Sequence, residues 1–105
     1  TRTMTPTVTH NNDPAGHSLT WIDAFDNEQT LTVAHYQTGP EWTVRRAISR
    51  PIPGGFDYVN TYWTTEHDLT SNCFSGALAN ATAHADYAVA NVVELRRKMA
   101  TLPAS

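Results

Sequence analysis

A regular repeat of apolar residues in the last third of the chain places the strongest constraint on its fold. From Phe74 to Met99 these residues recur at alternating intervals of four and three, which over about seven turns is the spacing of one helix face. They are Phe74, Leu78, Ala81, Ala85, Ala88, Val92, Leu95 and Met99. Thr70, Ser71 and Asn72 offer side-chain oxygens that can cap a helix N-terminus. The sequence therefore predicts one long C-terminal helix that begins near residue 74.

The residues before this helix change to a period of two, which is typical of half-buried β-strands. Four such segments cover residues 19–25, 30–37, 41–49 and 56–65, and turn-forming residues separate them. Connections this short join neighbouring strands in antiparallel order. A chain of 105 residues is also long enough for one modest core. We therefore predict an α+β fold (ββββα) for residues 19–105, a four-stranded antiparallel meander on which the long helix packs.

Residues 1–18 differ from the rest and are predicted to form a flexible, extended N-terminal arm outside this single domain. Threonine occupies every odd position from Thr1 to Thr9, and Pro6 excludes a central strand because proline cannot donate to a ladder. Residues 10–17 are mostly turn formers and indicate a hinge. The alternative is an arm that pairs with a sheet edge, including the edge of another subunit.

Composition excludes several classes of protein. No apolar stretch approaches the roughly 18 to 20 residues that a membrane-spanning helix needs, so we expect no membrane association. The single cysteine, Cys73, rules out an internal disulfide framework and favours a reducing compartment. No secretion-signal pattern opens the chain, and we expect a cytoplasmic location. The use of Ala, Thr and Arg, with a single Lys, is typical of a GC-rich bacterial or phage genome.

The five histidines do not form a recognised metal-binding pattern. None of them falls in a spacing such as HxH or HExxH, and there is no CxxC. His10 and His17 flank a turn and are expected to chelate only weakly, while His84 is expected to lie exposed on the polar side of the helix. We therefore predict no metal site and no cofactor.

A small enzyme with a His/Asp/Cys pocket is one alternative function. Cys73 is expected at the N-terminus of the long helix, where the helix dipole lowers the pKa of a thiol. The residues that would have to meet in one pocket are His35, His67, Asp68 and Cys73. No serine-hydrolase motif or phosphate-binding loop accompanies them, so we assign no catalytic residue.

Single-stranded nucleic-acid binding is another alternative function. Arg45, Arg46 and Arg50 cluster on and just after one predicted strand, and Tyr36 lies in the neighbouring strand. Aromatic side chains together with arginines on an open sheet face are a common way to hold single strands. The order of four strands and a helix is similar to that of single-strand-binding coactivator and Whirly/Pur-type domains, which implies the same class of ligand. The net charge of -3 argues against a polyanionic ligand.

We predict that the main function is protein binding by a small, non-enzymatic regulatory or accessory module. One helix covers only one face of the predicted sheet, while aromatic residues occupy both faces. A second molecule is therefore expected to cover the other face, which favours a homodimer that also binds another protein. Tyrosine and tryptophan are frequent in such interfaces. The partner-binding residues that we predict are Trp42, Tyr58, Tyr62 and Trp63.

Overall fold

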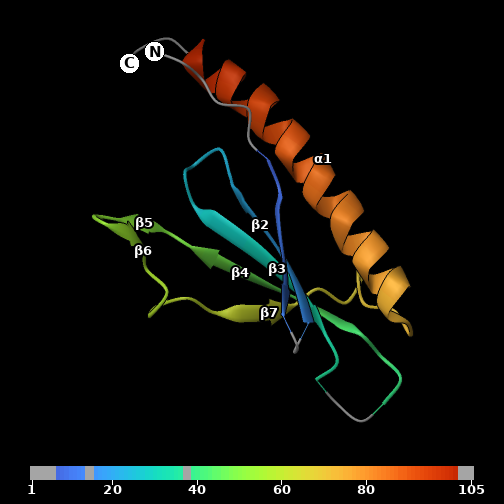
Figure 1. The fold of residues 1–105 in the computed structure, drawn as a ribbon. Helices are drawn as coiled ribbons and strands as arrows, with labels where there is room; N and C mark the ends of the chain where they lie inside the picture. The colour runs from blue at the N-terminus through green and yellow to red at the C-terminus, as the bar shows by residue number, and fades with distance from the viewer. Residues whose placement is uncertain (1–6, 14–15, 37–38, 102–105) are drawn as a thin grey trace.

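The structure, a computed structural model, describes residues 7–13, 16–36 and 39–101 of the chain. Five strands form one antiparallel sheet, and a long helix lies across one of its faces (Figure 1). In sheet order the strands are β1 (Thr9–Asp13), β2 (Gly16–Ile22), β3 (Glu28–Ala34), β4 (Thr43–Ser49) and β7 (Trp63–Thr65). A small separate hairpin joins β5 (Pro51–Ile52) to β6 (Gly55–Phe56), and the helix is α1 (Phe74–Ala100). The predicted α+β fold, an antiparallel meander with one long C-terminal helix packed on it, is confirmed.

The first strand, β1, belongs to the sheet although the sequence predicts an arm there. It pairs antiparallel with β2, from Thr9 opposite Thr20 to Asp13 opposite Gly16. The sheet therefore begins at Thr9 and not at residue 19: residues 9–13 of the predicted arm form an edge strand of the same chain, and residues 16–18 belong to β2. The sequence THNND does not predict a strand because it contains no alternating apolar residues. Residues 1–6 and 14–15 of the predicted arm lie outside the described residues.

The predicted strand over residues 56–65 is mostly a loop. Only Trp63–Thr65 pair with β4, while residues 57–62 connect the β5–β6 hairpin to this short strand. The carboxylate of Asp57 accepts hydrogen bonds from the backbone and the side chain of Asn60, and these compete with a ladder. The aromatic and β-branched composition of the segment thus predicts a strand by propensity, but local hydrogen bonds close a turn instead.

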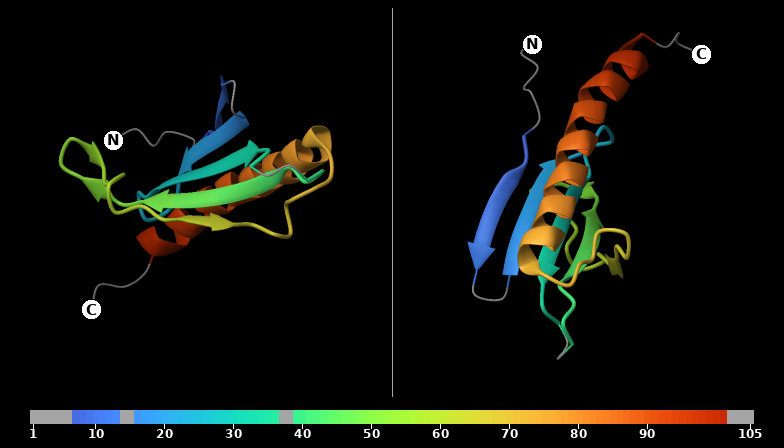
Figure 2. Two further views of the ribbon diagram at one scale, coloured as in Figure 1. Left: turned by 90° about the horizontal axis from the view of Figure 1, so that it is seen from below. Right: turned by 90° about the vertical axis from the view of Figure 1, so that its right-hand side faces the viewer.

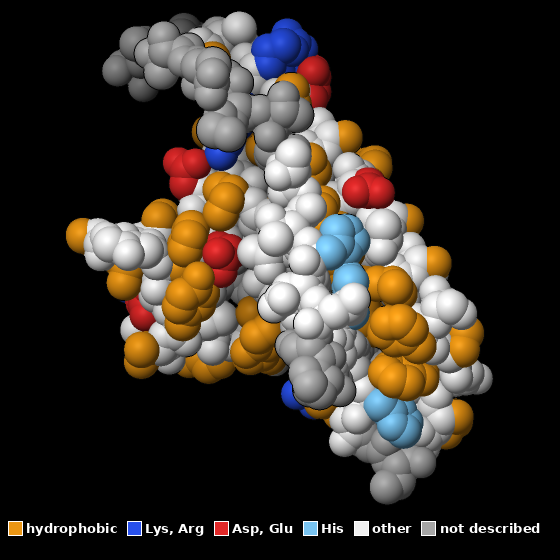
Figure 3. Space-filling view, viewed as in Figure 1, with side chains coloured by type: hydrophobic (Ala, Val, Ile, Leu, Met, Phe, Trp, Pro, Cys, Tyr) orange, Lys and Arg blue, Asp and Glu red, His pale blue; other side chains and the backbone are white. Residues whose placement is uncertain are grey.

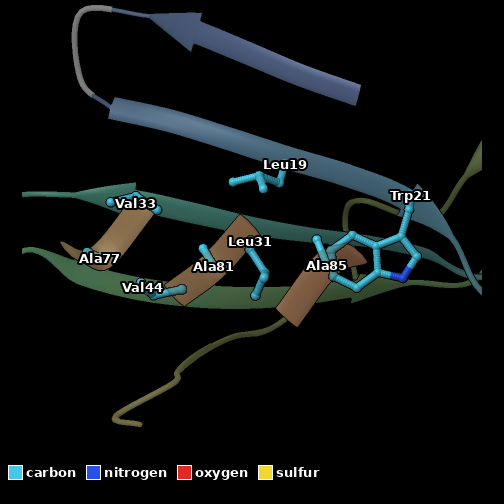
Figure 4. Packing of buried hydrophobic residues seen from close by; sticks show 8 residues of the cluster. All are labelled: Leu19, Trp21, Leu31, Val33, Val44, Ala77, Ala81 and Ala85. Atoms are coloured by element: carbon cyan, nitrogen blue, oxygen red, sulfur yellow. The ribbon is translucent and has the colours of Figure 1, made fainter. Parts of the chain in front are cut away.

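The core lies between α1 and the face of the sheet that the helix covers (Figure 4). Its buried members are Leu19, Trp21, Leu31, Val33, Val44, Ala77, Ala81 and Ala85. The helix contributes only alanines to this set, and their small side chains let its backbone approach the strands closely. The predicted alternation in β3 is present, because Leu31 and Val33 are buried whereas Thr30 and Thr32 are only half-buried on the other face.

The uncovered face of the sheet carries mainly hydroxyl groups in its centre. Across β2 and β3, Ser18 Oγ lies 3.4 Å from Thr32 Oγ1, and Thr20 Oγ1 lies 3.3 Å from Thr30 Oγ1. Hydroxyl groups can also bond to water, so this part of the face can remain solvated. The expectation that aromatic side chains cover both faces is therefore corrected for the centre of this face. Three exposed aromatic side chains, Tyr58, Tyr62 and Trp63, lie on the segment that follows β6.

The two ends of α1 are held differently. Cys73 is the N-cap, in place of the three predicted polar residues, and its sulfur accepts a hydrogen bond from the Gly76 N–H at 3.3 Å. Near the other end, Arg96 donates to the carbonyl oxygen of Asp23 at 3.0 Å and to the carboxylate of Asp26 at 2.9 Å. The helix then projects beyond the sheet (Figure 2). Within the described ranges, no helix combines the length and the hydropathy required to cross a bilayer.

Candidate functional site

Four large side chains are exposed on the segment between β6 and the end of β7, and we call this set the aromatic surface. Its members are Tyr58, Val59, Tyr62 and Trp63, which are 59%, 91%, 84% and 51% exposed. In the space-filling view, hydrophobic side chains gather over the β5–β6 hairpin and the neighbouring strand ends (Figure 3). Exposed apolar side chains grouped in this way are typical of an interaction site.

Hydrogen bonds fix the loop that carries the aromatic surface. The Thr61 hydroxyl donates to the carbonyl oxygen of Asp57 at 2.6 Å, which leaves Ser49 Oγ to donate to Thr61 Oγ1 at 2.8 Å. The Tyr58 hydroxyl donates to Glu28 Oε1 at 2.8 Å. The loop is thereby tied to both β3 and β4. A partner that binds these side chains does not have to order the loop first, and this lowers the entropic cost of association.

Asp57 closes the first turn of this loop. Its carboxylate accepts hydrogen bonds from the backbone N–H of Asn60 at 3.2 Å and from the Asn60 side chain at 2.9 Å, and Arg50 Nε lies 3.7 Å away. The side-chain hydrogen bond from Asn60, with a smaller effect from the charge of Arg50, lowers the pKa of Asp57. The hydrogen bond to Glu28 raises the pKa of Tyr58. At neutral pH the loop therefore holds an ionised Asp57 and a neutral Tyr58 hydroxyl.

The structure separates Trp42 from the other three predicted partner-binding residues. The Trp42 indole packs between His35, with ring centroids 5.2 Å apart, and Phe74, at 5.1 Å with the rings edge to face. Its backbone N–H donates to the Ser71 carbonyl oxygen at 2.6 Å, and the Ser71 N–H donates back at 3.2 Å. Trp42 therefore joins the sheet to the segment before α1.

The residues predicted for nucleic-acid binding are also divided. The Arg45 guanidinium stacks 3.8 Å from the centre of the Tyr36 ring, beside a cavity of about 390 Å³ that these two residues line with Thr43 and Thr65. Arg46 lies on the opposite face of β4, under the helix. Arg50 lies between β4 and β5, and its guanidinium is 3.7 Å from Asp57, which belongs to the loop that carries the aromatic surface. Only Arg45 and Tyr36 share one site.

Two of the residues predicted for an enzymatic pocket, His35 and Cys73, contact different groups. His35 contacts the carbonyl oxygen of Gly39 through Nε2 and stacks on Trp42, whereas Cys73 caps α1. Hydrogen bonds, first from the Ser75 hydroxyl and then from the Gly76 N–H, lower the pKa of the Cys73 thiol. Among His35, His67, Asp68 and Cys73, no hydrogen bond or ion pair joins any two in the part of the chain that the structure describes.

A polar network under α1 is the part of the structure that the sequence predicts least well. Arg46 Nε donates to Glu66 Oε1 at 2.6 Å, its NH1 group donates to Gln29 Oε1 at 2.5 Å, and its NH2 group contacts His84 Nε2. Gln29 in turn donates to Asp23 Oδ2 at 2.8 Å. The sequence allows Arg46 to pair with an acid such as Asp23 or to stack on an indole, and it leaves open which face of the sheet the helix covers. In the structure the acidic partner of Arg46 is Glu66. Contrary to expectation, His84 is half-buried.

This network makes the stability of the fold dependent on pH through His84. Burial, and then the charge of Arg46, lower the pKa of His84, while Glu66 raises it by a smaller effect. As the pH falls below about 6.5, the unfolded chain takes up a proton at His84 before the folded chain does, so stability falls. His84→Gln keeps an acceptor for Arg46 but cannot titrate. We expect urea unfolding at pH 7 and pH 5.5 to show a smaller loss of stability for this variant than for the unchanged chain.

The matched control for this experiment is His67→Gln, because His67 is exposed and lies outside the network. This variant should lose as much stability between the two pH values as the unchanged chain. An equal loss in the His84→Gln variant would show that the protonation of His84 is not coupled to folding.

A second cavity, of about 300 Å³, lies beside the network between α1 and the end of the β2–β3 hairpin. Its apolar lining includes Trp21, Phe25, Tyr87, Val92 and Leu95. Three or more metal-ligating side chains do not converge anywhere among the side chains that the structure describes, in residues 7–12, 16–36 and 39–101. Comparisons with protein-family models, with curated proteins and with solved structures found no significant match for this chain.

Proposed function

We propose that this chain is a non-enzymatic, regulatory protein-binding module, and that the aromatic surface is its binding site. The observation that carries the proposal is that Tyr62 and Val59 are 84% and 91% exposed on a loop whose backbone is already fixed by hydrogen bonds. Leaving such side chains in water forgoes the free energy of burying them. Rigid, exposed tyrosine and tryptophan side chains are the groups that contribute most to protein interfaces.

The occupant that we propose for the aromatic surface is a second copy of the chain, in a homodimer that can then present its other surfaces to a further protein. A two-fold contact requires a surface that is complementary to itself. The aromatic surface meets this requirement in its charges, because the acids Asp57 and Glu28 lie beside it together with the exposed Arg50. In a symmetric contact, Arg50 of one copy can approach the acids of the other.

A cytoplasmic location is part of the same proposal. Cys73 is exposed and has a free thiol, which is usual for proteins of reducing compartments. Single-stranded nucleic-acid binding has less support, because Arg46 and Arg50 are engaged elsewhere and the net charge is -3. Arg45 and Tyr36 alone provide a small contact for a polyanion.

Light scattering over concentrations of about 5 to 200 μM tests the homodimer directly. We expect the mass to approach twice 11.6 kDa. Tyr62→Ala should raise the dissociation constant of the dimer about tenfold, because it removes an exposed aromatic group from the centre of the contact. Tyr87→Ala is the matched control, since Tyr87 is also an exposed tyrosine, 69% exposed, but lies on α1 away from the loop.

Two results would overturn this proposal. The first is a monomer across the whole concentration range, and the second is an equal loss of association in both tyrosine variants. Circular dichroism of each variant separates a loss of binding from a loss of the fold.

A further inference from the structure

Two histidines that lie seven residues apart in the chain meet on the β1–β2 hairpin. His10 Nδ1 lies 2.8 Å from His17 Nε2, and the two ring centroids are 5.1 Å apart with the planes tilted by 50°. The strand register explains the contact: Asn12 is opposite His17, and His10 is opposite Leu19, which lies two residues from His17 on the same face. The cluster is therefore a product of strand pairing and not of a sequence motif.

Asn12 determines which nitrogen of His17 carries the proton. The amide oxygen of Asn12 lies 2.5 Å from His17 Nδ1, and it can only accept, so Nδ1 donates. In the neutral ring Nε2 then holds the lone pair, and His10 Nδ1 donates to it. A hydrogen bond to the second nitrogen is the usual device that orients a histidine for metal binding. His17 is only 8% exposed, so surrounding atoms also hold its ring in place.

We propose that His10 and His17 bind a divalent late first-row transition metal, Cu²⁺ or Zn²⁺, which takes the place of the hydrogen bond between them. Nitrogens bound at about 2.0 to 2.1 Å, at right or tetrahedral angles, lie about 2.8 to 3.4 Å apart, which includes the present separation. His10 is exposed and has to pivot so that its lone pair points at the ion. Its proton moves from Nδ1 to Nε2, and the ring remains neutral. Water completes the coordination, since the described side chains supply no third ligand.

The ion strengthens the attachment of β1 to β2, which at present includes the side-chain contacts of His10 and Asn12 to His17. Thr9, His10, Asn11 and Asn12 are all exposed, and none of these four side chains belongs to the core cluster. Backbone pairing with β2 and the contacts to His17 hold the strand in place. A metal that binds the folded hairpin, and not the open one, stabilises this pairing by mass action. Hydrogen exchange of the β1 amides should therefore slow when the metal is present.

Calorimetric titration of the metal-free chain tests the site with CuCl₂, ZnCl₂ and MgCl₂. We expect Cu²⁺ to bind more tightly than Zn²⁺, and Mg²⁺ to show no binding, because imidazole suits the first two ions and Mg²⁺ prefers oxygen ligands. His10→Asn and His17→Asn should each weaken Cu²⁺ binding at least tenfold. His67→Asn is the matched control, because it removes an exposed histidine outside the hairpin.

Because His17 is nearly buried, its substitution can also damage the hairpin, so a second measurement uses the unchanged chain. Small additions of paramagnetic Cu²⁺ should broaden the ring signals of His10 and His17 in the NMR spectrum before those of His35, His67 and His84. Equal broadening of all five histidines would overturn the proposal. So would a Cu²⁺ affinity of the His10→Asn variant that equals that of the His67→Asn control.

Discussion

Replacing Arg46 with alanine is expected to lower the free energy of unfolding by about 3 kcal/mol, because it leaves the Glu66 carboxylate without its charged partner beneath α1. The same change removes the donors to Gln29 and His84. It also opens a gap beside Val44 and Leu31, where the stem of Arg46 fills space. Chemical unfolding monitored by tryptophan fluorescence measures the change.

The adjacent residue provides the control for this prediction. Arg45 lies on the opposite face of β4, where its guanidinium stacks on Tyr36, and Arg45→Ala should cost about 1 kcal/mol or less. Arg46→Lys keeps the charge but loses the planar fork that reaches several partners, so its stability should lie between those of the unchanged chain and Arg46→Ala. Equal losses for Arg45→Ala and Arg46→Ala would contradict the role that we assign to the network.

Gly16→Ala is expected to destabilise the fold by about 2 to 3 kcal/mol. A Cβ at this position would lie 2.3 Å from the carbonyl oxygen of Val33 and 3.0 Å from the Cβ of Ala34. The first of these atoms belongs to the backbone of β3, so the clash cannot be relieved by rotating a side chain. The strands have to move apart at the point where β2 begins and pairs with both of its neighbours.

Gly39→Ala is the matched change for this experiment, because a Cβ at Gly39 meets no atom within 4 Å. Thermal unfolding should therefore show a clear loss for Gly16→Ala and little change for Gly39→Ala. A loss of similar size in both variants would point to a general effect of replacing glycine, through the unfolded chain, and would refute the specific clash at residue 16.

The elements that the sequence predicts correctly are those in which periodicity and burial agree. The apolar repeat that starts at Phe74 identifies α1, since a helix packed on a sheet must bury one face, and Ala81 and Ala85 are buried as expected. In β3, the alternation of Leu31 and Val33 with threonines identifies a half-buried strand for the same reason. Neither inference depends on distant parts of the chain.

The features that the sequence does not reveal depend on pairing between segments. β1 has polar side chains and is held by hydrogen bonds to β2, so no hydrophobic pattern within the strand predicts it. The contact between His10 and His17 depends on strand register, which cannot be read from the spacing of two histidines. The sequence predicts Tyr58, Tyr62 and Trp63 as binding residues, but it does not predict the loop that carries them. Composition alone favours a strand there, whereas the hydrogen bonds of Asp57 determine the loop conformation.

The unequal lengths of the helix and the sheet have a consequence for the last turns of α1. A helix of 27 residues is about 40 Å long, whereas a seven-residue strand is about 23 Å, so one helix end extends past the strands, as Figure 1 shows. Beyond Arg96 the helical conformation depends on local contacts such as the pair between Arg97 and Glu94. That end will fray and re-form as temperature and ionic strength change, while the alanine-lined turns stay docked. The helix content of this protein thus depends on temperature and ionic strength in the last turns of α1 and on core packing in the other turns.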